Sequence, residues 1–146
     1  MNQMDVLDDR VEALLGQSSI EFASRPGRVK LLKSEHAVLL VSSFVHDGRG
    51  FCRIAALLLS DVEPSLELIQ RILHANADLV LGSIQLFEDR VLALVITLPE
   101  SALEADTFEW TVRYAAWQAD ALVPVLSSAA RGRTSAELLG RQPPCG

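Results

Sequence analysis

Two apolar segments joined by a tight turn constrain the fold of this chain most. The first, HAVLLVSSFV, covers residues 36–45, and the second, FCRIAALLLS, covers residues 51–60. The five residues between them, HDGRG, contain the Asp47-Gly48 pair, which is typical of a two-residue hairpin turn. Both segments are apolar on both faces. The sequence therefore predicts a central antiparallel hairpin that is covered on both sides.

The residues before this hairpin predict one helix and further extended chain. Residues 5–16 repeat apolar side chains at helical spacing, and Gly16 stands where a helix commonly ends. Residues 21–33 are extended, with a turn at Pro26-Gly27 between two pieces. We count this stretch and the hairpin as three strands.

After the hairpin, Pro64 is expected to open a second helix that runs to Gly82. A second hairpin over residues 83–98 follows. The last helix is predicted to begin near Asp106, which has the spacing of a capping box with Glu109. Pro124 lies inside its apolar pattern and predicts a kink or an early end.

The resulting order is helix, three strands, helix, two strands, helix. It predicts an α+β fold with a five-stranded, mostly antiparallel sheet packed by helices. We expect a single domain over residues 1–130. From Arg131 onward the periodicity is lost and the sequence contains Pro-Pro, so residues 131–146 are predicted to be a flexible C-terminal tail.

Composition limits the classes of function. The net charge of −6 argues against nucleic acid as the main ligand, because such binding depends on neutralising phosphates. Residues 25–53 reverse this balance, with six basic and two acidic residues, but solvated strand edges and turns explain them better. No apolar run reaches the length of a membrane span, and the acidic start lacks a secretory pattern. We therefore expect a cytoplasmic protein without a membrane partner.

The last helix carries two apolar stripes. Trp110, Tyr114 and Trp117 form one of them at spacings of four and three residues. The other, on the opposite face, consists of Phe108, Val112, Ala115, Ala119, Leu122 and Leu126. The aromatic stripe is a candidate partner surface, since Trp and Tyr are enriched at binding hot spots. The alternative, which we favour, is that the rings pack on the domain's own sheet.

The second helix is also apolar over a wide arc. One stripe consists of Leu66, Ile69, Leu73, Ala77 and Val80, and the other of Leu68, Ile72, Ala75 and Leu79. An arc this wide needs more than one neighbour. Leu68, Ile72 and Leu79 are therefore our candidate dimer interface, with burial on two sides within one chain as the equal alternative.

No pattern in the sequence indicates catalysis, a cofactor or a metal. His36, His46 and His74 lack ligand spacing, and the two cysteines, Cys52 and Cys145, lie far apart. Glu88 and Asp89 are expected in a solvated turn, and Ser42-Ser43 lies within a strand instead of on a nucleophile elbow. We therefore predict a protein that is not an enzyme.

The element order resembles the YbjN-like family, which is related in fold to the class I (CesT-like) chaperones of type III secretion. The resemblance covers about residues 5–130. It is clearest over residues 51–103, where a strand, a proline-started helix, a glycine, a hairpin and a Leu-Pro pair lead into the last helix. It implies a small acidic homodimer that binds segments of other proteins without catalysis, with a part in stress response or regulation. Nothing in the sequence indicates a secretion system, so we favour the YbjN-like branch.

Three hypotheses of function follow. The first is a homodimeric chaperone-like or adaptor protein that recognises a protein segment by apolar contacts, with strand addition at a sheet edge contributing hydrogen bonds. The second is an enzyme with a site hidden in the concave face of the sheet. The third is a regulatory subunit with weak nucleic-acid contact through the stretch from Arg25 to Arg53. A roadblock- or profilin-like topology is the alternative fold.

Overall fold

The central hairpin is confirmed in the computed structural model, which describes residues 2–33, 37–130 and 133–134. Strand β3 (Val38–His46) pairs antiparallel with β4 (Arg49–Ser60) from Leu39 to His46. Asp47 and Gly48 both have positive φ angles, 51° and 73°, as the two central residues of a type I′ hairpin turn require. The sequence-based prediction of the turn is therefore correct to the residue.

The sheet has more strands than the five predicted. Six of the described strands follow the order β1-β2-β3-β4-β6-β5, and a two-residue strand, β7, pairs with β4. The other strands are β1 (Phe22–Arg25), β2 (Val29–Lys33), β5 (Ser83–Leu86), β6 (Leu92–Pro99) and β7 (Arg133–Thr134). Every pair among them is antiparallel.

The extra strands have two causes. Gly27 and Arg28 adopt positive φ angles, so the chain reverses there and residues 21–33 form a hairpin instead of one strand. The second cause is β7, which lies inside the predicted tail. The rest of residues 131–146 lies outside the described residues, so the boundary at 130 stays a prediction.

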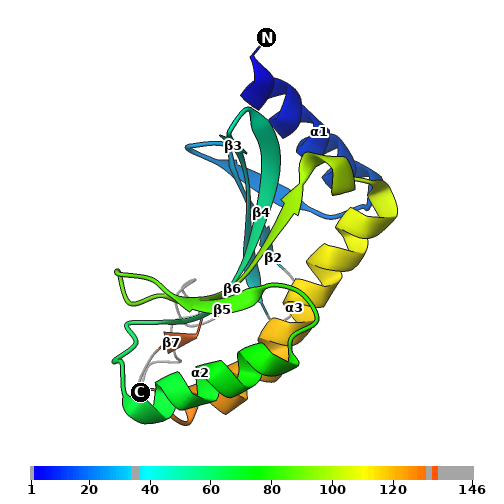
Figure 1. Ribbon diagram of the computed structural model, residues 1–146. Helices are drawn as coiled ribbons and strands as arrows, with labels where there is room; N and C mark the ends of the chain where they lie inside the picture. Colours follow the sequence, from blue (N-terminus) through cyan, green and yellow to red (C-terminus); the bar gives the residue numbers. More distant parts are fainter. Residues whose placement is uncertain (1, 34–36, 131–132, 135–146) are drawn as a thin grey trace, which may run out of the picture.

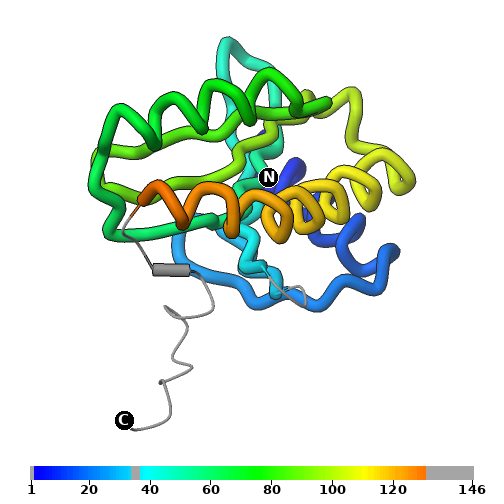
Figure 2. The backbone as a smooth tube through the Cα atoms, turned by 90° about the horizontal axis from the view of Figure 1, so that it is seen from below, coloured from blue at the N-terminus to red at the C-terminus, as the bar shows by residue number. Residues whose placement is uncertain are grey.

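Three α-helices accompany the sheet, namely α1 (Gln3–Gln17), α2 (Leu66–Asp78) and α3 (Ala105–Ser127). Helices α1 and α3 cover one face of the strongly curved sheet, and α2 lies beside α3 at one end (Figures 1 and 2). A short 3-10 turn, η1 (Glu100–Ala102), leads from β6 into α3. The α+β class is thus confirmed.

The helices bury one common core against the sheet. Side chains of α1 and α3 meet the same-face side chains of β3, β4 and β6 in a single apolar cluster. On the opposite face of the sheet, Leu40, Ala55 and Leu57 are half-buried. Because α1 and α3 both pack on the same face, the prediction that the hairpin is covered is confirmed for that face. For the opposite face, which no helix of the described chain covers, it stays a prediction.

Several predicted helix ends also differ. Helix α2 begins after Ser65, whose Oγ accepts a hydrogen bond from the Leu68 backbone N–H, so Pro64 precedes the cap. It ends at Asp78. Gly82 instead serves the loop before β5, with a φ of 77°, where a Cβ atom would lie 2.6 Å from the Val95 carbonyl oxygen.

Helix α3 begins after Glu104, which makes no side-chain cap, so the predicted capping box at Asp106 does not form. Glu109 instead pairs with Arg113 one turn later. Pro124 does not end the helix early. It removes one backbone donor in the last turn, yet α3 continues to Ser127.

Candidate partner-binding surfaces

The predicted aromatic stripe of α3 is divided between core and surface. Tyr114 is buried, and its hydroxyl oxygen accepts a hydrogen bond of 3.0 Å from the Val80 backbone N–H. Trp110 stacks on Tyr114, with ring centroids 5.0 Å apart, and is half exposed. Trp117 is 76% exposed. The opposite stripe, Phe108 to Leu126, lies entirely in the core.

The candidate interface on α2 lies on the inner side of the helix. Leu68 is fully buried, and Ile72 and Leu79 pack against the core of the same chain. The structure therefore places Leu68 where no partner can reach it in this conformation. The neighbouring stripe is the exposed one. It consists of Leu66, Ile69 and Leu73, which are 72%, 45% and 64% exposed, and we call it the α2 stripe.

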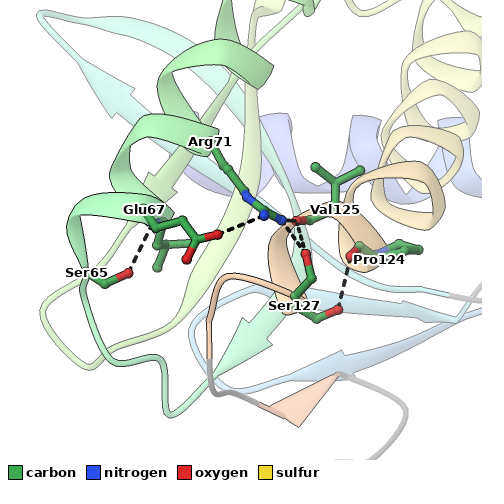
Figure 3. Close-up of polar contacts among 8 residues, drawn as sticks. Ser65, Glu67, Arg71, Pro124, Val125 and Ser127 are labelled. Carbon is green, nitrogen blue, oxygen red and sulfur yellow. Dashed lines mark hydrogen bonds and ion pairs between the residues drawn. The ribbon is translucent and has the colours of Figure 1, made fainter.

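Arg71 fixes α2 against the end of α3 (Figure 3). Its guanidinium donates to the Glu67 carboxylate at 2.9 Å, to the Val125 carbonyl oxygen at 2.8 Å and to the Ser128 hydroxyl. Because the last four carbonyls of a helix have no partner within it, this contact caps the C-terminus of α3 with a positive charge. The α2 stripe is thus held in place from the opposite side of the helix.

Asn76 joins α2 to the outermost strand, β5. Its amide group accepts from the Ile84 N–H at 2.6 Å and donates to the Ile84 carbonyl oxygen at 3.3 Å. These are the backbone groups that an added strand would use, so α2 blocks this edge of the sheet. Strand addition of the predicted kind is left to β1, the other edge, whose residues after Phe22 are exposed.

Two grooves run along α3. One, of about 620 Å³, lies between α3, β2 and the end of α1, with an apolar floor that includes Leu32, Leu39 and Val112. Trp117 lines this groove together with charged groups of both signs, among them Lys33 and Asp120. The other, of about 360 Å³, separates α3 from α2. An exposed tryptophan beside an apolar floor is an arrangement that suits a protein partner.

The helix-free face of the sheet contains a third hollow of about 700 Å³. We call it the sheet hollow. It is lined by Leu40, Ala55, Leu57, Leu59, Ser60, Phe87, Glu88, Asp89, Val91 and Ala93. Apart from Ser60 and the two acidic residues at the β5–β6 turn, these side chains are apolar. An enzyme site in the concave face was the predicted alternative, and this hollow offers few polar side chains that could take part in catalysis.

The basic stretch from Arg25 to Arg53 is partly neutralised within the chain. Lys30 is 3% exposed, and its ammonium lies 3.0 Å from Asp8 and 2.9 Å from Glu12, both on α1. Burial alone would lower the pKa of Lys30, but the hydrogen bonds and charges of Glu12 and Asp8 raise it above 10.5. Arg28 pairs with Asp5, and the Arg53 guanidinium lies over the Phe44 ring.

Reactive and metal-binding groups are sparse in the described part of the chain. No cluster of three or more His, Cys, Asp or Glu residues there could hold a metal ion. Burial raises the pKa of the Cys52 thiol to about 12, with a smaller contribution from Asp8. His46 and His74 are exposed, whereas His36 lies outside the described residues. None of the described helices is both long and apolar enough to cross a bilayer.

Comparison with known proteins identifies the fold class. No family model matches the chain, and no curated protein matches it. A three-helix α+β fold of this kind is found among solved structures. One match is the crystal structure of YbjN from E. coli, described as a candidate transcription regulator, with a TM-score of 0.58 and 15% sequence identity. The match covers 84% of this chain and 93% of the YbjN chain, so this protein has a YbjN-like fold.

Proposed function

We propose that this protein is a cytoplasmic, non-catalytic protein-binding module that acts as a homodimeric chaperone-like or adaptor protein, with a part in stress response or regulation. The observation that carries the proposal is the α2 stripe. Three large aliphatic side chains on one face of α2 are exposed, although apolar side chains on a helix are usually buried. Apolar surface gathered in this way is typical of interaction sites.

The α2 stripe and the Trp117 groove have different roles in this proposal. The α2 stripe lies on a helix that Arg71 and Asn76 hydrogen-bond to α3 and β5, so it suits a symmetric contact with the same helix of a second copy. The Trp117 groove combines a ring that is 76% exposed with an apolar floor and mixed charges, so it suits a segment of another protein.

Partner capture with matched variants tests the binding role. Trp117→Asp removes the ring and places a charge in the groove, whereas Ala121→Asp places the same charge at an exposed position one turn further along α3. Wild-type protein and both variants are immobilised, and proteins captured from the native cell extract are quantified by mass spectrometry. A protein retained by wild type and Ala121→Asp but lost with Trp117→Asp supports the proposal. Equal capture by all three contradicts it.

The alternative is a regulatory subunit with nucleic-acid contact through the basic strand region. The description of YbjN as a candidate transcription regulator favours it, together with Arg25, Lys33 and Arg49, which remain exposed. Fluorescence anisotropy with labelled single-stranded DNA provides the test. Binding that weakens steeply between about 50 and 200 mM salt supports this alternative, and no binding at the lower concentration contradicts it.

A further inference from the structure

The sheet hollow is an apolar surface that no described element covers. Leu40, Ala55 and Leu57 form its floor and are half-buried, and Phe87 is exposed at its edge. No residue of α1, α2 or α3 lines the hollow, so it belongs to neither surface of the proposed function. The apolar floor favours an apolar segment as occupant, and the acidic residues at the rim, Glu88 and Asp89, favour a positive charge next to that segment.

Strand β7 ends beside this hollow, because Leu59 and Ser60 both pair with β7 and line the hollow. Leu59 of β4 pairs with Leu92 of β6 on one side and with Thr134 of β7 on the other, so β7 lies on the side of β4 that β3 occupies. Three residues earlier in β4, Ala56 already pairs with Leu39 of β3. Beside β4 there is therefore almost no room between β7 and β3, so a segment that follows β7 is expected to leave the plane of the sheet.

The two directions out of the plane are not equivalent. On the helix side, Leu58, Leu126 and Ala130 are buried in the core at this end of the sheet. On the other side, Leu59 and Ser60, the residues that pair with β7, line the sheet hollow directly. The side with open space is therefore the hollow.

The sequence that follows Thr134 matches the hollow in polarity and length. It reads SAELLGR, with Leu138 and Leu139 four and five residues beyond Thr134 and Arg141 shortly after. An extended chain covers roughly 13–18 Å in that distance. Crossing from the position of β7 to β6 spans two strand spacings, or about 10 Å. Because side chains alternate along an extended chain, Leu139 and Arg141 share one side, so Leu139 can reach the floor of the hollow while Arg141 reaches its acidic rim.

We propose that residues 135–141 bind in cis in the sheet hollow, with Leu139 against Leu57 and with Arg141, on the same side of an extended segment, facing Glu88 and Asp89. In this proposal the protein's own chain occupies the second apolar face of the sheet. It leaves the helix layer as the face for partners. The proposal does not depend on the function of the α2 stripe.

A spin label on Cys145 tests this contact in the full chain. Cys52, the other cysteine, is buried and protonated near neutral pH, so the label reacts with Cys145. We expect the methyl NMR signals of Leu40, Leu57 and Ala93 to lose most of their intensity when the label is attached. The methyl signals of Leu7 and Leu14 on α1, on the other face, should keep theirs.

Variants and a mixed sample make the outcome decisive. The double variant Leu138→Asp with Leu139→Asp should restore the lost intensities. The control variant Gln142→Asp adds a negative charge beyond the proposed contact and should not restore them. Intensity loss that survives the double variant, or that is weak and uniform, overturns the proposal. The proposal is also overturned if labelled protein broadens these signals in an isotope-enriched Cys145→Ser protein, because the occupant is then a second copy.

Discussion

Lys30 is the residue with the most strongly paired buried charge in the described part of the chain. Its substitution by methionine keeps the aliphatic packing but leaves the part-buried carboxylate of Asp8 without its cation. We expect Lys30→Met to lower the free energy of unfolding by roughly 2–4 kcal/mol, because one partner of a buried pair remains behind. Urea unfolding at neutral pH measures it. Lys33→Met, an exposed position on the same strand, should change stability by less than about 0.5 kcal/mol.

Cys52 predicts how stability depends on alkaline pH. Burial raises the pKa of its thiol from 9.0 to about 12, so above pH 9 the unfolded chain loses a proton that the folded chain keeps. The contribution of this group is therefore complete below pH 9 and is lost as the pH rises toward 12. We expect Cys52→Ala to unfold with a weaker loss of stability between pH 8 and pH 10.5 than wild type. Identical pH profiles would contradict the buried, protonated thiol.

Individual side chains also mark where sequence reasoning stops. The spacing of Trp110, Tyr114 and Trp117 correctly indicates one face of a helix. It does not tell that Tyr114 is buried against Val80 while Trp117 is exposed, because that depends on where α2 ends relative to α3. A buried tyrosine needs a hydrogen-bond partner, and no pattern in the sequence predicts a backbone N–H 34 residues away.

Among the elements, β5 depends most on a contact from outside the sheet. Asn76 satisfies both backbone groups of Ile84 at the sheet edge. We expect Asn76→Ala to lower the free energy of unfolding by about 1–3 kcal/mol, since it leaves a part-buried N–H and carbonyl unpaired. Hydrogen exchange should become faster at Ile84, and the freed edge should increase aggregation on warming. Gln85→Ala, on the same strand and exposed, should leave both properties unchanged.

The elements themselves were predicted better than their ends and their orientation. Period and turn residues indicate all three α-helices and both predicted hairpins, because local chemistry determines them. The turn at Pro26-Gly27 is confirmed, but the sequence does not show that the two pieces beside it pair as β1 and β2, because that pairing depends on a positive φ at Arg28. The sequence indicates both stripes of α2, but only the packing of Ile72 and Leu79 against the core, with α2 beside α3 and β5, decides which stripe faces outward.

In the whole molecule, the packing of α1 and α3 on one face of the sheet determines which apolar surfaces stay accessible. With α1 and α3 on the same face of the sheet and α2 beside α3, the helix layer presents the α2 stripe and Trp117, while the other face presents the sheet hollow. The sequence indicated excess apolar surface on two helices. It could not indicate the hollow, because that surface arises from the curvature of strands distant in sequence.

We infer that the α2 stripe is the contact between two copies of the protein, and sedimentation equilibrium measures whether it is. Leu73→Asp should cost an isolated chain less than about 0.5 kcal/mol, because the side chain is exposed there. Buried unpaired in a dimer, the same carboxylate should cost at least about 3 kcal/mol, roughly a hundredfold in the dissociation constant.

We predict that wild-type protein and Gln70→Asp, an exposed polar position on the same helix, sediment as dimers at micromolar concentration, whereas folded Leu73→Asp sediments as a monomer. Circular dichroism and the unfolding midpoint establish that the variant is folded. A wild-type monomer, or a dimer that Leu73→Asp leaves intact, would contradict the claim.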